Sequence, residues 1–524
     1  MNVDFYDKPF SSKRNNIVAK NGVVSTSNNL ASQAGLDMLK QGGNAVDAAI
    51  ATAACLTVVE PCSNGLGSDG FAIVWMKDKM YGMNASGYSP YEIDASKIDS
   101  IPAKGWTPVM VPGAVKGWRA LSERFGELPF SKLLEPAINY AKNGFPVSPE
   151  IARMWNKAVP AMPTTPEFDE WFSTFTFDGK APQAGQFIRL PKIAQALEKI
   201  ADTKTDALYY GELADAIEET SRKFGGFLRK KDLEDYDVEW VNPISADYHG
   251  YKVWEIPPNG QGIVALMALN ILNNFHFESR NATCLHTQME AIKMAFADAK
   301  AYVTDPTLMQ MPVEDLISPE YGKKRAKQIT RHAQMPKIDK PHGSGTVYLC
   351  TADSQGNMVS YIQSNYMGFG SGIVVDGVSL QNRGYDFSLD SNHVNYLMPH
   401  KKTYHTIIPG FLTKDDKPVG PFGVMGGYMQ PQGHVQVVTN MIDFHLSPQM
   451  ALDSRRFQWM KDMKFVVEPD FDEDLVEVLR MRGHEIEYED ELAQFGRGQI
   501  IVQLDNGVYV VGCESRADSN ISCF

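Results

Sequence analysis

The sequence predicts a mixed α and β protein (class α+β) in which two β-sheets stack between layers of helices. Strand-like patterns occur on both sides of Thr346, at 71–76 and 251–256 before it and at 347–352 and 358–363 after it. Segments with helical periodicity surround these strands. Sheets that helices cover on their outer faces form a layered body, and 524 residues are enough for one large body or for two domains.

Composition indicates an ordinary globular protein that acts on small molecules. Hydrophobic residues make up 43% of the chain and charged residues 22%. The net charge of −13 repels phosphate backbones and anionic lipid, and lysines and arginines do not alternate with aromatic residues. We therefore expect no nucleic acid and no membrane among the partners.

Several features favour the cytoplasm. The first residues lack a basic stretch followed by an apolar core, and no apolar run of about 18 residues occurs. The six cysteines have no paired spacing, which is typical of reduced thiols rather than of a disulfide framework or a zinc site. The eleven histidines form no ligand spacing either, so we predict no metal and no other cofactor.

The amino-terminal part begins with clear helix signals. Asn28 and Asn29 can cap a helix over 30–40, and Asn44 can cap a second helix over 45–58 that is apolar all round and hence buried. A glycine-rich segment, 63–70, then leads into the strand at 71–76. By spacing alone these glycines are more typical of turns than of a site.

The middle of the chain is mainly helical. A helical block extends over 112–275, and a long helix is predicted at 284–303. Residues 310–341 are polar and broken by prolines, which predicts an exposed linker. Further on, strands are predicted at 371–381 and 406–413.

Thr346 begins the first strand of a predicted hairpin and follows a glycine-rich segment that ends at Gly345. If the Thr346 hydroxyl attacked the Gly345 carbonyl, an ester would replace the peptide bond, and hydrolysis would free the α-amino group of Thr346. With a pKa of roughly 7.7–8.0, that amine can act as the base for its own side chain. A loop that simply enters a sheet is the ordinary alternative.

Residues 346–360, followed by Phe369-Gly370-Ser371-Gly372-Ile373, resemble the segment that opens the small subunit of γ-glutamyltransferases (γ-glutamyltranspeptidases, glutathione hydrolases). Residues 30–49 and 64–71 resemble the opening of the large subunit. The resemblance implies an N-terminal-nucleophile hydrolase with a four-layer αββα sandwich. It also implies autocleavage between Gly345 and Thr346, with a large subunit at 1–345 and a small subunit at 346–524.

The same resemblance suggests further catalytic residues. Gly426 and Gly427 match the glycine pair whose backbone N–H groups hold the oxyanion of acyl transfer, although as isolated residues they would make a turn. Ser364 falls where the family has a hydroxyl that is hydrogen-bonded to the nucleophile; a satisfied strand serine is the ordinary alternative.

The substrate side departs from the family. Its arginine before an Ala-Pro pair is absent from 86–90, and its serine pair is missing near 401–407. Asp386 matches the acid that holds the α-amino group of the substrate. Arg383 stands where a glutamine or glutamate is usual, and we hypothesise that its guanidinium binds the substrate carboxylate. A structural salt bridge with a neighbouring acid is the alternative.

Three functions stay open. The chain can be a self-processing amidohydrolase that passes a γ-glutamyl group from an acyl-threonine to water or an amine. With the same chemistry it can take a glutaryl group, as cephalosporin acylases do, or a poly-γ-glutamate end. It can also be an uncut binding scaffold. Processing predicts fragments of 345 and 179 residues that remain together as a heterodimer, and two heterodimers can assemble further.

Overall fold

Two large sheets form the centre of the protein. The computed structural model describes residues 14–335 and 345–524. In the first sheet the strand order is β21 (Asn520–Cys523), β2 (Gly22–Thr26), β10 (Gly345–Asp353), β11 (Met358–Tyr366), β3 (Asp69–Met76), β4 (Lys79–Ala85) and β7 (Glu239–Val241). In the second it is β1 (Ile17–Ala19), β20 (Tyr509–Cys513), β19 (Arg497–Gln503), β15 (Lys417–Met425), β14 (Gly410–Lys414), β9 (Tyr251–Glu255) and β8 (Ile244–Tyr248).

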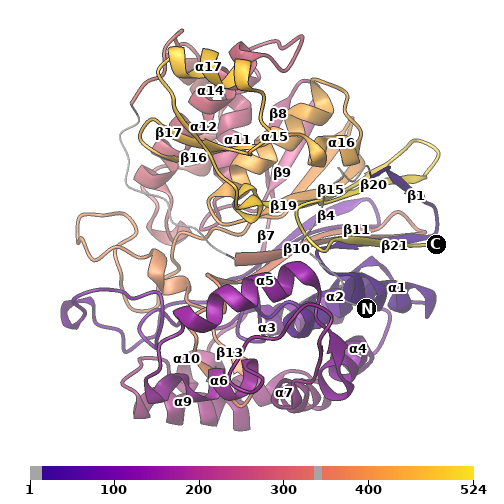
Figure 1. The fold of residues 1–524 in the computed structure, drawn as a ribbon, viewed down its shortest axis with the longest axis vertical. Coiled ribbons are helices and arrows are strands. Elements are labelled where there is room, and N and C mark those ends of the chain that lie inside the picture. The colour runs from indigo at the N-terminus through magenta and orange to yellow at the C-terminus, as the bar shows by residue number, and fades with distance from the viewer. Residues whose placement is uncertain (1–13, 336–344) are drawn as a thin grey trace.

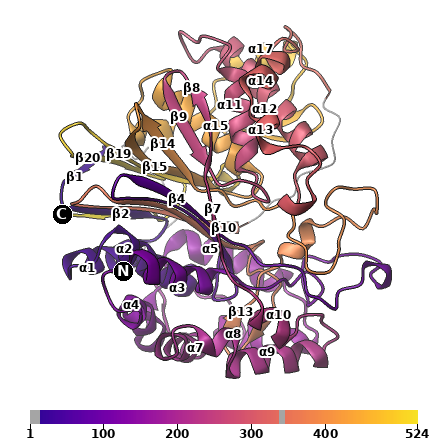
Figure 2. The ribbon, with the colours of Figure 1, turned by 180° about the vertical axis from the view of Figure 1, so that it is seen from behind.

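Helices cover the outer face of each sheet, as Figures 1 and 2 show from opposite sides. The first sheet is covered by α1 (Asn29–Lys40), α2 (Ala45–Val59), α3 (Ala114–Phe125) and α4 (Phe130–Asn143). The second is covered by α11 (Gly262–Leu272), α12 (Ala282–Tyr302), α15 (Met429–Ile442) and α16 (Pro448–Asp453). The predicted αββα sandwich is thus confirmed.

The local signals explain the innermost helix layer. The side chain of Asn28 caps α1 by accepting from the Leu30 N–H, and Asn44 forms a capping box with Asp47 at the start of α2. Every residue of α2 is buried, because this helix packs between the first sheet and α4. A helix enclosed in this way has no polar face, as its composition predicts.

The space between the two sheets is filled by large apolar side chains such as Phe71, Ile362 and Phe411. Tyr348 of β10 lies against β15 so closely that a Cβ on Gly423 would be 2.4 Å from its ring. This contact fixes how the central hairpin of β10 and β11 sits on the second sheet.

A helical lobe extends below the first sheet in Figure 1. It contains α5 (Pro149–Ala158), α6 (Asp169–Phe175), α7 (Pro191–Asp202), α8 (Asp206–Tyr209), α9 (Glu212–Lys223) and α10 (Lys230–Glu234), with the short strands β5 (Phe145–Pro146) and β6 (Phe187–Ile188). At the opposite end, α17 (Glu473–Met481) packs near a small sheet of β16 (Phe457–Lys461), β17 (Lys464–Val467) and β18 (Glu485–Tyr488).

Three predicted segments differ in the structure. Much of the expected linker at 310–341 is folded: α13 (Val313–Leu316) and α14 (Pro319–Ala326) pack against the α11 region, with Leu316 and Gly322 buried. Prolines start these short helices instead of preventing them. Residues 336–344 lie outside the described residues.

The strand predicted at 371–381 is instead a hairpin of two short strands with two residues each, β12 (Val374–Val375) and β13 (Val378–Ser379). The strand predicted at 406–413 begins only at Gly410. The first of these segments packs against α6 and α9, so its apolar pattern reflects burial rather than strand pairing. Within the described residues, no helix combines the length and apolar character needed to cross a membrane.

Candidate active site

Thr346 lies at an irregular point of the central hairpin. Gly345 pairs with Tyr366 and Val347 pairs with Gln363, so the single residue Thr346 faces two residues of β11. This bulge turns the Thr346 side chain toward Ser364, and the two hydroxyl oxygens are 3.1 Å apart. Both residues are fully buried. The predicted hydrogen bond between Ser364 and Thr346 is therefore present.

The backbone beside this hydroxyl pair is strained. Ser364 Oγ accepts a hydrogen bond from the Tyr366 N–H at 2.7 Å, and Tyr366 has a φ of +77°. A bulky residue in the left-handed region is uncommon and persists only when its surroundings hold it there. Here the Tyr366 hydroxyl donates to Asp386, and the Arg383 guanidinium lies 4.2 Å from the centre of the Tyr366 ring.

Asp386 is connected to the same tyrosine. Its Oδ1 accepts hydrogen bonds from the hydroxyls of Tyr366 and Tyr428, each at 2.9 Å. Its Oδ2 is buried and has no hydrogen-bond partner within residues 14–335 and 345–524. One oxygen is thus held in place while the other remains open to a donor, which suits the predicted grip on a substrate ammonium group.

Arg383 combines both interpretations of its role. Its Nη1 donates to Thr406 Oγ1 at 2.7 Å, and its Nε lies 3.4 Å from Asp69 Oδ2, so the alternative salt bridge exists. Its Nη2 is buried without a hydrogen-bond partner in the described part of the chain. One edge of the guanidinium therefore stays available to a carboxylate.

Two further residues at the site, Asp69 and His405, carried no recognisable sequence signal. Asp69 pairs across the strands with Ser364, and its Oδ2 accepts from His405 Nε2 at 3.0 Å. Burial lowers the pKa of His405 to about 4, so the imidazole is neutral near neutral pH and donates through Nε2. Asp69 belongs to the glycine-rich segment 63–70, in which the Ser68 hydroxyl donates to Asn365 Oδ1 at 2.8 Å. That segment therefore borders the site in addition to forming turns.

Gly426 and Gly427 follow β15 at the same end of the sandwich as Thr346. The far end of β10 is marked by Asp353, whose carbonyl accepts from the Tyr509 hydroxyl, and Tyr509 pairs with the last residue of β19. Because β15 runs antiparallel to β19, the last residue of β15 lies at the end of the sandwich away from Asp353, which is the end where Thr346 lies. The two glycines have φ values of +143° and +59°, which side chains rarely allow.

Other bonds connect the glycine pair to the substrate-side residues. Gln261 Nε2 donates to the carbonyls of both Gly427 and Thr406, at 2.8 and 2.6 Å. Thr406 in turn accepts from Arg383. The structure thus gathers all the site residues predicted from the sequence, namely Gly345, Thr346, Ser364, Arg383, Asp386, Gly426 and Gly427, into one connected region. Their individual roles stay predictions.

A cavity of about 620 Å³ borders this region and is lined by Gly426 and Tyr428. Its other walls come from α5, from residues 367–369 and from β16. It therefore connects the glycine pair and the tyrosine that holds Asp386 to open space.

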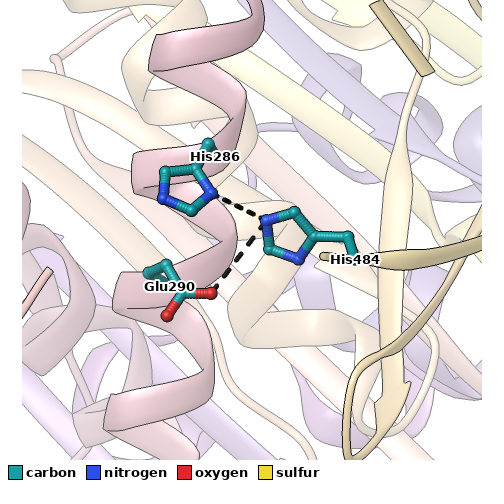
Figure 3. A group of neighbouring side chains, drawn as sticks. All are labelled: His286, Glu290 and His484. Atoms are coloured by element: carbon teal, nitrogen blue, oxygen red, sulfur yellow. Dashed lines mark hydrogen bonds and ion pairs between the residues drawn. The ribbon is translucent and has the colours of Figure 1, made fainter. Parts of the chain in front are cut away.

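A second buried cluster lies on the other side of the second sheet (Figure 3). His286 and Glu290, one turn apart on α12, point toward His484. His286 Nδ1 and His484 Nε2 are 2.8 Å apart, within hydrogen-bond range. Two nitrogens bound tetrahedrally to zinc would be about 3.3 Å apart. Glu290 Oε1 also lies 2.6 Å from the Lys293 ammonium. The cluster therefore fits hydrogen bonding better than an ion, although the sequence spacing did not reveal it.

The cluster fastens the segment that precedes residues 336–344. His286 Nε2 lies 2.8 Å from the Thr330 carbonyl, Lys293 donates to the Gln334 carbonyl at 2.8 Å, and the Gln334 N–H donates to Glu290 at 3.2 Å. Because a carbonyl only accepts, His286 carries its proton on Nε2 and accepts from His484 at Nδ1. The arrangement is a structural anchor.

Two stacked sheets between helical layers, with a threonine hydroxyl at the start of a central strand, define the N-terminal-nucleophile class of hydrolases. Comparison with known proteins is more specific. A family model described as Gamma-glutamyltranspeptidase matches residues 31–524. The chain belongs to this family.

Similar proteins carry the names of different substrates. A glutathione hydrolase-like proenzyme of Bacillus subtilis (strain 168) is 38% identical over 489 residues, which cover 90% of this chain and 92% of that protein. The oxamate amidohydrolase proenzyme of Klebsiella pneumoniae is 31% identical over 523 residues, covering 96% and 98%. The crystal structure of cephalosporin acylase from Bacillus halodurans matches with a TM-score of 0.97 at 50% identity, covering 100% of this chain and 99% of that one.

Proposed function

We propose that the chain cuts itself between Gly345 and Thr346 and then hydrolyses or transfers the acyl group of γ-glutamyl-type amides. The observation that carries this proposal is the 3.1 Å contact between the hydroxyls of Thr346 and Ser364 at the bulge where β10 begins. Ser364 also accepts from a backbone N–H. These contacts hold the Thr346 oxygen in place beside Ser364, where it can attack a carbonyl carbon as a nucleophile.

Self-cleavage requires only this chain and water. Thr346 Oγ attacks the Gly345 carbonyl carbon, its proton passes to the departing nitrogen, and the peptide bond becomes an ester. Water then hydrolyses the ester, which leaves a carboxylate on Gly345 and a free α-amino group on Thr346. This amine is the base that Thr346 lacks while the chain is uncut.

In turnover, the α-amino group takes the proton of Thr346 Oγ as the oxygen attacks the substrate carbonyl. The N–H groups of Gly426 and Gly427 stabilise the oxyanion, and the proton passes to the leaving amine. Water or a second amine then releases the acyl group from Thr346. The Thr346 hydroxyl, its α-amino group and the backbone N–H groups of the glycine pair supply the proton transfers and the oxyanion hydrogen bonds of these steps.

The open polar atoms favour a γ-glutamyl group as the acyl donor. Asp386 Oδ2 can accept from an ammonium group, and Arg383 Nη2 can donate to a carboxylate. A γ-glutamyl group carries both charges on its α-carbon. A glutaryl group carries only the carboxylate, which would have to bind an Arg383 that Asp69 already partly neutralises. It is the second candidate because a cephalosporin acylase is similar over the whole chain.

The two fragments are expected to remain associated as a heterodimer. In the first sheet, β10 and β11 of the second fragment lie between β2 and β3 of the first. In the second sheet, β14 of the second fragment pairs with β9 of the first. Separating the fragments would expose both sheets and their apolar faces. A dimer of such heterodimers and a cytoplasmic location are further parts of this proposal.

Denaturing electrophoresis with amino-terminal sequencing tests the processing step. We expect fragments of 345 and 179 residues, the smaller beginning at Thr346, that elute together under native conditions. A single full-length band in active protein would contradict self-cleavage, and a single band without activity would support the binding-scaffold alternative.

Acyl-group profiling tests the substrate. Arg383→Ala should raise KM for γ-glutamyl and glutaryl amides much more than for a neutral butyryl amide. Equal effects on all three would assign Arg383 to the structure alone.

A further inference from the structure

The cavity beside Gly426 has an apolar wall that can adapt its shape. Four methionines and two aromatic residues contribute to it: Met154, Met162, Met367, Met460, Phe369 and Trp459. Methionine side chains are flexible and polarizable, so such a wall accommodates bulky apolar groups of several shapes. The volume of about 620 Å³ exceeds what an acyl group the size of glutamate needs.

The same cavity is basic, although the chain as a whole is acidic. Lys104, Arg153, Lys157 and Arg497 line it with a single acid, Glu491, whereas the whole chain has a net charge of −13. Lys157 pairs with Glu491, and Arg153 pairs with both Glu491 and Glu150, so two carboxylates largely neutralise these two cations. Clefts lined by one sign of charge concentrate ligands of the opposite sign.

Arg497 lines the cavity next to the glycine pair. It pairs across the strands with Met425, the residue before Gly426, and its side chain is only 6% exposed. Its Nη1 forms an ion pair of 3.5 Å with the buried Glu60, and its Nη2 donates to Met154 Sδ at 3.4 Å. Its Nε is buried with no hydrogen-bond partner within residues 14–335 and 345–524. Leaving a buried guanidinium N–H without a partner is costly, so the Arg497 side chain favours an anionic ligand to which it can donate.

Lys104 is a second cation on the cavity wall. Its ammonium donates to the carbonyls of Gly368 and Gly370 at 2.5 and 2.8 Å. Among the described residues it makes no ion pair with a carboxylate. An ammonium has three donors, so one remains for a ligand.

We propose that this cavity binds the amine side of the substrate, as leaving group or acceptor, and selects amines with a bulky apolar body that carries a carboxylate. The apolar wall holds the body, and Arg497 and Lys104 hold the carboxylate. This inference rests on the proposed function, because the cavity is assigned to the amine by its position beside Gly426. It adds the chemical class of that amine and the two residues that recognise it.

Binding to uncut Thr346→Ala protein tests the proposal without any catalysis. The probes are 5-amino-2-nitrobenzoate and 4-nitroaniline, two aromatic amines that differ by one carboxylate, and titration calorimetry measures Kd. We expect the carboxylate to tighten binding about 10-fold, as one charge-assisted contact does. Lys104→Met and Arg497→Gln should each remove most of this difference and leave binding of 4-nitroaniline unchanged.

The matched control is Lys157→Met, which removes a cation of the same cavity that Glu491 already neutralises. It should leave the preference for the carboxylate within about 2-fold. Equal Kd values for the two probes, or equal losses in all three variants, would overturn the proposal. Lys104 is half-buried and outside any regular element, so its variant folds even if Arg497→Gln does not.

Kinetics on the processed enzyme separate this inference from the proposed function. The γ-glutamyl anilides of the two probes should differ about 10-fold in kcat/KM, and Lys104→Met should bring the ratio close to one. If neither anilide is cleaved while the binding preference persists, the proposed function fails and the cavity assignment stands. Cleavage of both at equal rates, with equal binding, would refute the cavity assignment alone.

Discussion

The protein contains two polar clusters that each include a carboxylate but differ in their surroundings. The first joins Thr346, Ser364 and Asp386, and the second joins His286, Glu290 and His484. Both contain buried polar atoms without a hydrogen-bond partner in the described residues, such as Asp386 Oδ2 and His484 Nδ1. Unpartnered atoms alone therefore do not identify a site.

The difference lies in strain and in access. The Thr346 cluster includes a tyrosine with a φ of +77° and, through Tyr428, borders a cavity of about 620 Å³. The His484 cluster bonds to the backbone of residues 330–334. A strained backbone next to open space is typical of a reaction site, whereas a cluster bonded to its own chain stabilises the fold.

The largest expected effect comes from the nucleophile. Thr346→Ala should abolish cleavage and lower activity by about 10⁴-fold or more, because no other group can form the acyl ester. Electrophoresis and an amide-hydrolysis assay measure both. Thr351→Val is the control: it removes another buried hydroxyl of the same strand, which bonds to the Ala45 carbonyl, and should leave processing intact. Cleavage in the Thr346 variant would place the reaction elsewhere.

The next largest effect concerns the open carboxylate oxygen. Asp386→Asn should lower kcat/KM for a γ-glutamyl amide roughly 30-fold, the equivalent of about 2 kcal/mol for a charge-assisted hydrogen bond. A glutaryl amide, which has no ammonium group, should change by less than about 3-fold. Asp390→Asn, in an exposed part of the following loop, serves as the control. Similar losses on both substrates would mean that Asp386 only holds the two tyrosines.

The second cluster should affect stability rather than chemistry. Lys293→Met leaves Glu290 buried without its cation and should lower the free energy of unfolding by about 3 kcal/mol. Urea titration of the uncut Thr346→Ala chain measures this loss, with the exposed Lys324→Met as control. In the processed enzyme kcat should stay within about 2-fold. Zinc should leave the Tm unchanged; a clear rise with zinc would turn the anchor into a metal site.

The smallest effect is a pH dependence of stability. Burial lowers the pKa of His484 to about 2, so the folded chain keeps this imidazole neutral while the unfolded chain protonates it below about 6.5. Stability is therefore lost as the pH falls below 6.5. His484→Gln should reduce that loss by about 1 kcal/mol per pH unit between pH 6 and 5 in the uncut chain. His332→Gln, at an exposed histidine, should not. An unchanged slope would mean that His484 is charged in the fold.

Local signals in the sequence were sufficient for most regular elements. Asparagine caps, a fully apolar helix and the turn between β10 and β11 depend on neighbours within a few residues, so the pattern predicts them. The family resemblance added the site residues and the αββα name. Residues 313–326 were misjudged because short helices that begin with proline look like linker until a partner such as α11 buries them.

The sequence by itself determined that a threonine follows a glycine at the start of a central strand, and that the chain has enough apolar periodicity to build layers around it. Only the tertiary structure decided that Asp69 and His405 stand behind Arg383, that Tyr428 shares Asp386 with Tyr366, and that Arg497 reaches the cavity beside Gly426. These residues are between 20 and more than 300 positions apart. Contacts over such distances follow from how the two sheets stack, which no local pattern encodes.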